Sequence, residues 1–427
     1  MHVQRKAVSL SAETCLQPVM NKIVRCPIEG RRILFVISRF LDGGIDTVLV
    51  ELLKNLIAHA PSLRISLVIL LKMEGKEVFF NQIPKSVDVH YLVDEPWLLV
   101  YKRWRLDGHR NKLFSLLDEC FLNPIRYFLM RSRFHCLQRD ADVVIDMDAR
   151  AHSIIHWSLP TYNIAYFHFS FQHMIDTRPH YMRRMAKGMA DYDVVVSISK
   201  AMAEEGASLF PQLKDKLVTI YNGVRQERIQ RLAGEEVTHP LWLRLSRQGY
   251  MLAVERLEES QKDLTTLIKA YALLAQRMPG APHLVVLGEG RDRELLQQLI
   301  NQCSLQEHVH LLGFTQNPYP WMKHAQLLVH SSRFEGLPTV LIEALMLEKH
   351  IIASDCPTGP REILANGDAG MLVPVGDAEA MATALQAVLT DVALQERLRA
   401  GVRMQIALFQ PHENILKLFD LFMSRLR

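Results

Sequence analysis

The stretch QLLVHSSRFEGLPTVLIEAL, residues 326–345, contains an apolar run, a polar loop and a second apolar pattern in that order. The run 326–332 is typical of a buried parallel strand, and Pro338 suits the first position of the helix that follows the loop. Glu335 stands in the loop, and Glu343 stands one to two turns into the predicted helix. The stretch therefore predicts a β-loop-α unit with an acidic side chain at the carboxyl end of its strand.

The same alternation of apolar runs and helical patterns extends over most of the 427 residues. The runs predicted as strands are 31–38, 64–71, 141–147, 162–169, 191–199, 249–257, 283–290, 309–314, 326–332 and 350–355. This alternation predicts an α/β protein with parallel sheets covered on both faces, and the length predicts two domains facing each other across a cleft. We expect an N-terminal extension (1–30), a first Rossmann-like domain (31–235), a second (236–408) and a final helix (409–427) that packs back on the first domain.

The composition, with 49% hydrophobic and 22% charged residues, is that of a globular protein. No run of about 18 uncharged apolar residues occurs, so no transmembrane helix is predicted, and the N-terminus lacks the apolar core of a signal peptide. The six cysteines are scattered without a C-x-x-C pair, which argues against a zinc site and for a reducing, cytoplasmic location. The net charge of +4 is too small to indicate nucleic-acid binding.

Several loops at predicted strand ends carry groups that suit an anionic ligand. Gly43 and Gly44, in LDGGID (41–46), would let backbone amides approach an anion, although such a pair of glycines is more often a plain tight turn. Arg256 and Lys262 follow the first strand of the second half and suit a diphosphate, or they form a solvated loop paired with neighbouring glutamates. The amides that begin the helix after Pro338 would lack intrahelical acceptors and suit phosphate.

His168 closes a predicted strand in the segment AYFHFSF. A histidine among aromatic residues is more often a satisfied core residue than a catalyst. Its place at the carboxyl end of a strand, where open α/β sheets bind ligands, favours a site role. The same two interpretations apply to the opening stretch, because a helix start with one solvated glutamate would also explain Glu335.

Together these segments resemble a known family. The E-x7-E pattern with GLP after its first acid, the segments NPYPWM and GPREIL, and a later G-x-L-V-P all occur between residues 308 and 378. Here the chain is similar to family 4 glycosyltransferases of the GT-B fold, in which two Rossmann-like domains enclose the active site. The likeness extends more loosely from residue 33 to near the end, and it is strongest to bacterial enzymes that build lipopolysaccharide, O-antigen and capsule.

The resemblance implies a role for each residue that matches a family motif. Glu335 would contact the donor sugar near the reacting carbon, Glu343 would bind the ribose hydroxyls, and His168 would lie near the transferred sugar. Arg256 and Lys262 would neutralise the leaving diphosphate, so neither a metal nor another cofactor is expected. The other donor-binding positions that the family implies are Gly43 and Gly44, then Gly313 and Phe314 beside the base, and the backbone amides of Gly336, Leu337, Thr339 and Val340. Asn222 and Gly223 match the segment before the interdomain linker.

The resemblance also implies a reaction. A sugar would pass from a nucleotide sugar, with UDP favoured by family habit, to a glycan or lipid-linked acceptor with retention of configuration. Glu255 stands where the family has a glycine, and Ile45-Asp46 replace the more common Ala-Glu after the two glycines. Two other functions stay open: a phosphorylase or epimerase of the same fold, and a non-catalytic subunit that binds a nucleotide sugar, which Glu255 would favour.

Two segments of the first half combine aromatic and basic side chains. Residues 97–139 and 178–188 hold aromatic and apolar side chains interleaved with lysine and arginine, among them Lys102, Arg126 and Arg133. This combination suits peripheral contact with an anionic membrane on its cytoplasmic face. Amphipathic helices with aromatic residues in the core and charges in solvent are the alternative explanation.

Overall fold

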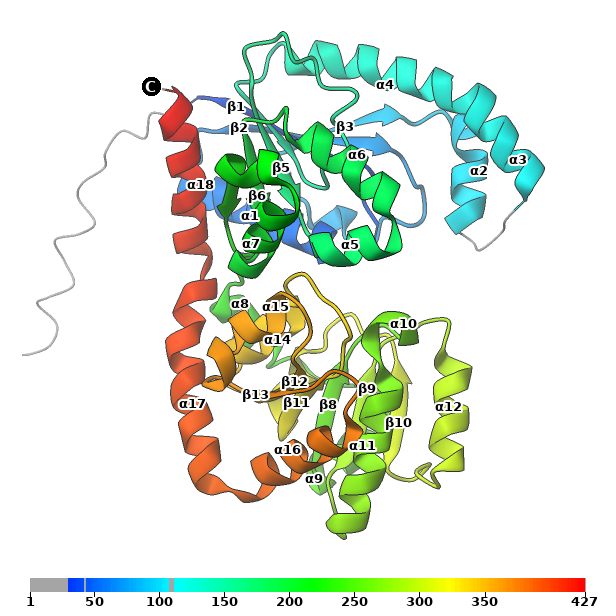
Figure 1. Cartoon of the computed structure of the whole chain (residues 1–427), viewed down its shortest axis with the longest axis vertical. Helices are drawn as coiled ribbons and strands as arrows, with labels where there is room; N and C mark the ends of the chain where they lie inside the picture. The colour runs from blue at the N-terminus through cyan, green and yellow to red at the C-terminus, as the bar shows by residue number, and fades with distance from the viewer. Residues whose placement is uncertain (1–29, 42–43, 107–110, 427) are drawn as a thin grey trace, which may run out of the picture.

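The computed structural model describes residues 30–41, 44–106 and 111–426. Most of the predicted N-terminal extension, as well as Gly43, lies outside these described residues. Within them the chain forms two parallel sheets, each covered by helices, which are stacked one above the other in Figure 1. The predicted α/β class and two-sheet architecture are therefore confirmed.

The first sheet has the order β3-β2-β1-β4-β5-β6-β7, so the strand order reverses between β1 and β4. Its strands are β1 (Arg32–Ile37), β2 (Arg64–Leu71), β3 (Asp88–Val93), β4 (Val143–Asp146), β5 (Tyr162–Phe167), β6 (Val194–Ser197) and β7 (Leu217–Thr219). Their helices are α1 (Gly44–His59), α2 (Pro96–Leu106), α3 (Lys112–Leu117), a π-helical turn (Asp118–Leu122), α4 (Asn123–Gln138), α5 (Phe171–Thr177), α6 (Pro179–Met189) and α7 (Lys200–Leu209).

The second sheet has the order β10-β9-β8-β11-β12-β13 and reverses between β8 and β11. Its strands are β8 (Tyr250–Val254), β9 (His283–Leu287), β10 (Val309–Gly313), β11 (Leu327–His330), β12 (His350–Ser354) and β13 (Met371–Val373). The helices from the linker onward are α8 (Gln226–Leu232), α9 (Trp242–Gln248), α10 (Glu259–Lys262), α11 (Leu264–Arg277), α12 (Arg293–Gln302), α13 (Tyr319–His324), α14 (Thr339–Met346), α15 (Gly359–Ile363), α16 (Ala378–Thr390), α17 (Val392–Ile406) and α18 (Pro411–Leu426).

Helices α17 and α18 run along one side of the molecule and span both domains (Figure 1). The last helix, α18, packs against α1 of the first domain. Asn414 accepts a hydrogen bond from the backbone of Tyr221 at 3.2 Å, and the chain is so close here that a Cβ on Gly223 would lie 2.6 Å from Pro411. The end of the chain is thereby tied to the segment where the first domain passes into the linker.

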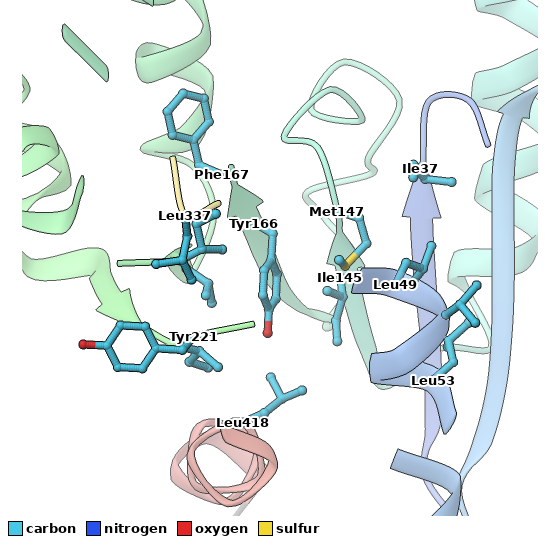
Figure 2. Close-up of a cluster of buried hydrophobic side chains, with 14 of the residues drawn as sticks. Ile37, Leu49, Leu53, Ile145, Met147, Tyr166, Phe167, Tyr221, Leu337 and Leu418 are labelled. Carbon is cyan, nitrogen blue, oxygen red and sulfur yellow. The ribbon is translucent and has the colours of Figure 1, made fainter. Parts of the chain in front are cut away.

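The loop that carries Glu335 also contacts the first domain. Figure 2 shows Leu337 beside Tyr166 and near Phe167 and Tyr221, and these side chains belong to one buried cluster. Glu362 on α15 makes a second contact between the domains. Its carboxylate accepts hydrogen bonds from the backbone amides of Lys200 and Ala201, at 2.9 and 3.2 Å, and from the Tyr221 hydroxyl. An acid at the start of α7 suits the partial positive charge of a helix N-terminus.

The structure corrects one part of the sequence interpretation of 97–139. Arg126, expected on a basic surface, is only 2% exposed and donates to both carboxylate oxygens of Asp118 at 2.8 Å. Lys102 pairs with the same carboxylate at 2.9 Å, and Arg133 pairs with Glu95 at 2.5 Å. These cations are internal to the α2–α4 arm because its buried or half-buried carboxylates need partners.

The aromatic side chains of this arm divide between core and surface. Phe134 is buried, and Tyr101 is nearly so, as the amphipathic alternative requires. In contrast, Trp97, Phe121 and Phe128 are 57%, 64% and 72% exposed. No helix in the described part of the chain is both long and apolar enough to cross a bilayer.

A substitution at Glu362 tests whether the contact between the domains stabilises the folded protein. Glu362→Ala removes three hydrogen bonds to the first domain, so we expect the free energy of unfolding, from urea titration, to fall by about 1–3 kcal/mol. Glu379→Ala is the matched control, because that carboxylate is exposed and pairs with Arg277 on the surface; we expect a loss below about 1 kcal/mol. Equal losses in the two variants would contradict a stabilising role for the Glu362 contact.

Candidate active site

The candidate site lies at the carboxyl ends of β8 and β11, which are neighbours at the reversal of the second sheet. Open α/β sheets bind ligands at such a point, because the loops after the two strands diverge and leave a crevice. The loop after β8 supplies Glu255, Arg256 and Lys262, and the loop after β11 supplies Glu335. The fold therefore brings together residues that are about 75 positions apart in the sequence.

The Glu335 carboxylate is the centre of the site and is only 10% exposed. It accepts hydrogen bonds from Lys262 Nζ at 2.6 Å and from Ser332 Oγ at 2.7 Å, and His330 Nε2 lies 3.3 Å away. Burial by itself would raise the pKa of Glu335, but the charges of Lys262 and His330 hold it well below its usual range. The carboxylate is therefore ionised at any physiological pH.

The two predicted cations differ in their environment. Lys262 is 12% exposed at its side chain; burial would lower its pKa, but the carboxylates of Glu335 and Glu255 raise it. The Arg256 side chain is 70% exposed and reaches Gln261 at 3.2 Å and Glu258 at 3.8 Å. The structure thus places Lys262 against Glu335 and leaves the Arg256 guanidinium at the surface of the same loop.

Glu255, the departure from the family glycine, faces away from solvent. Its side chain is 1% exposed, and Oε1 lies 2.8 Å from Nδ1 of His330, which is fully buried at the end of β11. Burial would lower the pKa of His330, but the carboxylates of Glu255 and Glu335 raise it to about 9. A continuous chain of alternating charge therefore runs Glu255, His330, Glu335, Lys262.

Glu343 lies one turn into α14 and accepts a hydrogen bond from the Tyr319 hydroxyl at 3.2 Å. Burial raises the pKa of Glu343 to about 7, with the Tyr319 hydroxyl and the positive charge of Arg228 opposing the rise. Pro338 precedes α14 as its N-cap and is not the first helical residue. The amides of Thr339 and Val340 consequently open the helix without intrahelical acceptors, a geometry that suits an oxyanion.

A pocket of about 420 Å³ lies beside the end of β10 and is lined by Gly313, Phe314 and Trp321 together with the linker segment 235–240. Phe314 is 67% exposed, and Gly313 has a φ of +86°, which a side chain would strain. The aromatic ring at the edge of a hollow offers a stacking surface for a planar group.

Gly336 brings the second domain directly against the first. A Cβ at this position would lie 2.3 Å from the backbone carbonyl oxygen of His168, which is closer than any real contact. Only glycine permits this approach, and the neighbouring Leu337 side chain then enters the first-domain cluster shown in Figure 2. The short loop between Glu335 and α14 therefore serves both the site and the domain interface.

His168 is 8% exposed, and burial lowers its pKa to about 4, so the ring is neutral at physiological pH. Its ring bonds to the backbone of Met147, while Nε2 is buried and has no hydrogen-bond partner among the described residues. Gly44, the remaining first-domain glycine, is exposed and begins α1, with no atom within 4 Å of an added Cβ. Among the described residues no group of three or more His, Cys, Asp and Glu side chains could hold a metal ion.

Residues 242–404 match the family described as glycosyl transferases group 1. This match covers most of the second domain, which we call the group 1 domain. A glycosyltransferase of Methanocaldococcus jannaschii is 35% identical over 40% of this chain and 42% of its own length. The N-acetylgalactosamine-N,N'-diacetylbacillosaminyl-diphospho-undecaprenol 4-alpha-N-acetylgalactosaminyltransferase of Campylobacter jejuni is 32% identical over 48% of this chain and 53% of its own. The chain thus spans about half the length of these curated relatives.

The likeness to solved structures covers both domains. The crystal structure of HepE from Anabaena in complex with UDP superposes with a TM-score of 0.69, covering 92% of this chain and all of that one at 16% identity. At this identity the likeness concerns the fold, and the fold is GT-B. The first domain therefore has the GT-B partner architecture, although the sequence match is confined to the group 1 domain.

The sequence interpretation missed several side chains of the group 1 domain site. His330 and Ser332 support Glu335, Tyr319 supports Glu343, and the linker 235–240 lines the pocket. The only sequence signal for His330 is a histidine within the apolar run LLVHSS, which a buried partner alone would explain. Its partner Glu255 was visible as a departure from a motif, but the pairing of the two depends on adjacent strands.

Glu255→Gln tests the charge chain. Removing one partner of a buried ion pair costs about 3–5 kcal/mol of unfolding free energy, so we expect a loss of this order at pH 7. Because the pKa of His330 is raised in the folded state, the ionised ring contributes fully to the free energy of unfolding below pH 6.5. This contribution is lost as the pH rises through about 9. The urea midpoint of the wild type should therefore fall between pH 7.5 and 10 more steeply than that of the variant.

The matched control is Glu289→Gln, which removes an exposed carboxylate paired with Arg293 in the same domain. We expect this variant to keep the wild-type stability and the wild-type pH dependence. Parallel pH profiles for the wild type and Glu255→Gln would show that His330 carries no charge in the folded protein.

Proposed function

We propose that the protein is a retaining, metal-independent glycosyltransferase of family 4 that transfers a sugar from a nucleotide sugar, with UDP as the favoured nucleotide, to a glycan or lipid-linked acceptor. Its product would belong to bacterial surface polysaccharide such as lipopolysaccharide, O-antigen or capsule. The observation that carries the proposal is the buried Glu335–Lys262 pair at the reversal of the group 1 domain sheet. The complex of HepE with UDP and the sugar-transferring relatives support it.

The charges of the site suit the departure of a nucleoside diphosphate. In the proposed reaction the bond between the anomeric carbon and the β-phosphate oxygen breaks, and negative charge grows on the diphosphate. Lys262, the exposed Arg256 guanidinium and the amides of Thr339 and Val340 can stabilise that charge, which lowers the barrier. The acceptor hydroxyl would attack from the same face and release its proton to the departing phosphate oxygen.

The remaining groups would position the donor. The ionised Glu335 carboxylate can accept hydrogen bonds from sugar hydroxyls. Glu343, on the same loop-helix unit, can accept hydrogen bonds from the ribose hydroxyls. Phe314 offers its exposed ring to the base at the mouth of the 420 Å³ pocket. The neutral His168, with a free Nε2, would face the sugar from the first domain.

The non-catalytic alternative drew its support from Glu255, which would have placed an unpaired acid beside the diphosphate. In the structure that carboxylate is buried and paired with His330. An internal ion pair explains the departure from the family glycine and leaves the diphosphate loop without an extra exposed acid. This observation favours the enzyme over the non-catalytic subunit.

Two isosteric substitutions separate the roles of the acids. Glu335→Gln removes the charge next to the sugar, so we expect transfer to fall by a factor of about 100 or more while UDP affinity changes by less than tenfold. Glu343→Gln should chiefly weaken the binding of UDP, and calorimetry measures that affinity. Because burial raises the pKa of Glu343 to about 7, UDP affinity of the wild type should fall from pH 8 to pH 6, and this dependence should vanish in the variant.

Controls distinguish these effects from unfolding. Glu379→Gln changes an exposed carboxylate that pairs with Arg277 on the surface of the same domain, and it should keep both transfer and UDP affinity. Release of nucleoside diphosphate only when an acceptor is added would support the transferase. Tight UDP binding with no turnover on any acceptor would refute it, and equal losses of transfer and affinity in both variants would refute the division of roles.

We further propose that the protein lies in the cytoplasm and touches the inner face of an anionic membrane through the α2–α4 arm and α6. Exposed Trp97, Phe121 and Phe128 supply apolar contact. Arg183, Arg184 and Lys187 on α6 are exposed and supply positive charge. Such a combination binds the headgroup region of anionic bilayers. The carboxylate partners of Lys102, Arg126 and Arg133 neutralise these three cations of the arm.

Co-sedimentation with phosphatidylglycerol vesicles tests this contact. The double variant Phe121→Ser/Phe128→Ser should bind at least about tenfold more weakly, because each exposed ring would otherwise be removed from water. Met404→Ser is the matched control, since Met404 is 74% exposed on α17 in the second domain. Wild-type protein that stays in the supernatant at low salt would refute membrane contact, and equal binding by the double variant would refute the role of the arm.

A further inference from the structure

The first domain has its own reversal of strand order, between β1 and β4. The loops that leave these two strands meet there, since Ser38 after β1 donates both its backbone amide, at 3.3 Å, and its hydroxyl to the Asp148 carboxylate after β4. In Figure 2 the labelled Ile37 and Met147 lie near the heads of the two arrows. By the same rule that places the donor site in the second sheet, this crevice is a place for a ligand.

The crevice carries an excess of positive charge. Arg39 follows Ser38, Arg150 follows Asp148, and Arg105 comes from the last turn of α2. We call Arg39, Arg105 and Arg150 the arginine cluster. Arg150 Nε lies 3.8 Å from Asp148, whereas neither Arg39 nor Arg105 has a hydrogen-bond or ion-pair partner within the described part of the chain. Among the described residues, Arg39 is thus influenced by the positive charges of Arg105 and Arg150 and by one carboxylate, that of Asp148.

This excess is unfavourable in the unliganded protein. Arg39 is half-buried, and burial together with the charges of Arg150 and Arg105 lowers its pKa, while Asp148 offsets only part of the effect. The nearby Asp146 supplies little compensation: it is fully buried, it is bonded to the Tyr192 hydroxyl at 2.6 Å and to the amide of Ala151 at 2.7 Å, and burial raises its pKa to about 7. Unpaired like charges held together in a crevice are typical of a site that awaits an anion.

We propose that the arginine cluster binds a phosphate or diphosphate group of the acceptor, so that the protein is selective for acceptors that carry phosphate close to the hydroxyl to be glycosylated. This proposal rests on the glycosyltransferase function proposed above. Arginine is the side chain best suited to phosphate, because its planar fork donates two parallel hydrogen bonds to the oxygens of one group.

The position of the cluster favours the acceptor over the donor as the source of the anion. The cluster belongs to the first domain, whereas Lys262 and the amides that begin α14 belong to the second. The loop after β4, which carries Asp148 and Arg150, also contacts the histidine proposed to face the sugar, because the ring of His168 bonds to the backbone of Met147. The substrate named for the Campylobacter jejuni relative contains a diphosphate linked to a lipid, which fits this class of acceptor.

The test uses inorganic pyrophosphate as the probe, titrated calorimetrically into full-length protein saturated with UDP. With UDP occupying the donor site, the wild type should bind pyrophosphate. Arg39→Gln/Arg150→Gln should bind it about ten- to a hundredfold more weakly, the range expected for lost charge-assisted hydrogen bonds, with UDP affinity within about twofold of wild type. Arg39→Lys keeps the positive charge but loses the planar guanidinium. Its pyrophosphate affinity should lie between those of the wild type and the double variant.

Two further measurements make the test specific. Arg139→Gln removes an exposed arginine at the amino end of β4 in the same domain and should leave pyrophosphate binding unchanged. Thermal unfolding should show no loss of stability in Arg39→Gln, since burial and the repulsion from Arg150 and Arg105 outweigh the attraction of Arg39 to Asp148.

The outcomes distinguish this proposal from the function on which it rests. Unchanged pyrophosphate binding in the double variant would overturn the arginine cluster as a site. A parallel fall in UDP affinity would assign the cluster to the donor diphosphate and would overturn the acceptor proposal. Wild-type protein that does not bind UDP would instead refute the proposed nucleotide, and that result is read from a separate titration.

Discussion

The burial of the Glu335 carboxylate is the constraint on which the rest of the site depends. A carboxylate with 10% exposure stays ionised only if positive charge lies close to it, and Lys262 and His330 supply that charge from two different strands. His330 in turn is buried completely and keeps its proton because Glu255 lies behind it. The four side chains alternate in sign, so each one makes the ionised state of the next favourable.

The two strand-order reversals of the molecule differ in their charge balance. In the second domain the carboxylates of Glu255 and Glu335 face the two cations His330 and Lys262, so the charges of these four side chains balance. In the first domain the described residues bring Arg39, Arg105 and Arg150 near one carboxylate, that of Asp148, and a bound anion would offset this excess of positive charge. A donor site that is balanced and an acceptor site that is not would favour charged acceptors while limiting self-repulsion in the unliganded protein.

The domain contact and the chemistry share the same short loop. Gly336 approaches the carbonyl of His168, and Leu337 packs among first-domain aromatic residues, directly after Glu335. Glu362 adds a polar contact from the neighbouring helix α15. Any change in how the two domains meet will therefore move Glu335 relative to the first domain, which couples domain orientation to the geometry of the candidate site.

The pattern of the sequence predicted the buried central strands and the edge strand β10, but it missed the other three edge strands. Strands β1, β2, β8 and β11 are continuous apolar runs because both their faces are covered, and periodicity detects such runs. Strands β3, β7 and β13, at the edges of the sheets, went unpredicted; β7 and β13 have three residues each, and the first four residues of β3 are exposed or half-exposed. The basic surface of 97–139 was overestimated for a related reason, because composition does not reveal that Arg126 is turned inward toward Asp118.

By itself the sequence determined the α/β class, the strand-loop-helix unit around Glu335 and Glu343, and the likeness to glycosyltransferases. Each of these follows from residues close together in the chain, where spacing translates directly into local structure. Only the tertiary structure decided that Glu255 is an internal partner of His330, that Lys262 and not the Arg256 side chain meets Glu335, and that Arg39, Arg105 and Arg150 gather at one crevice. Those relations join side chains on strands and helices far apart in sequence, and their energies depend on burial and distance, which no local pattern encodes.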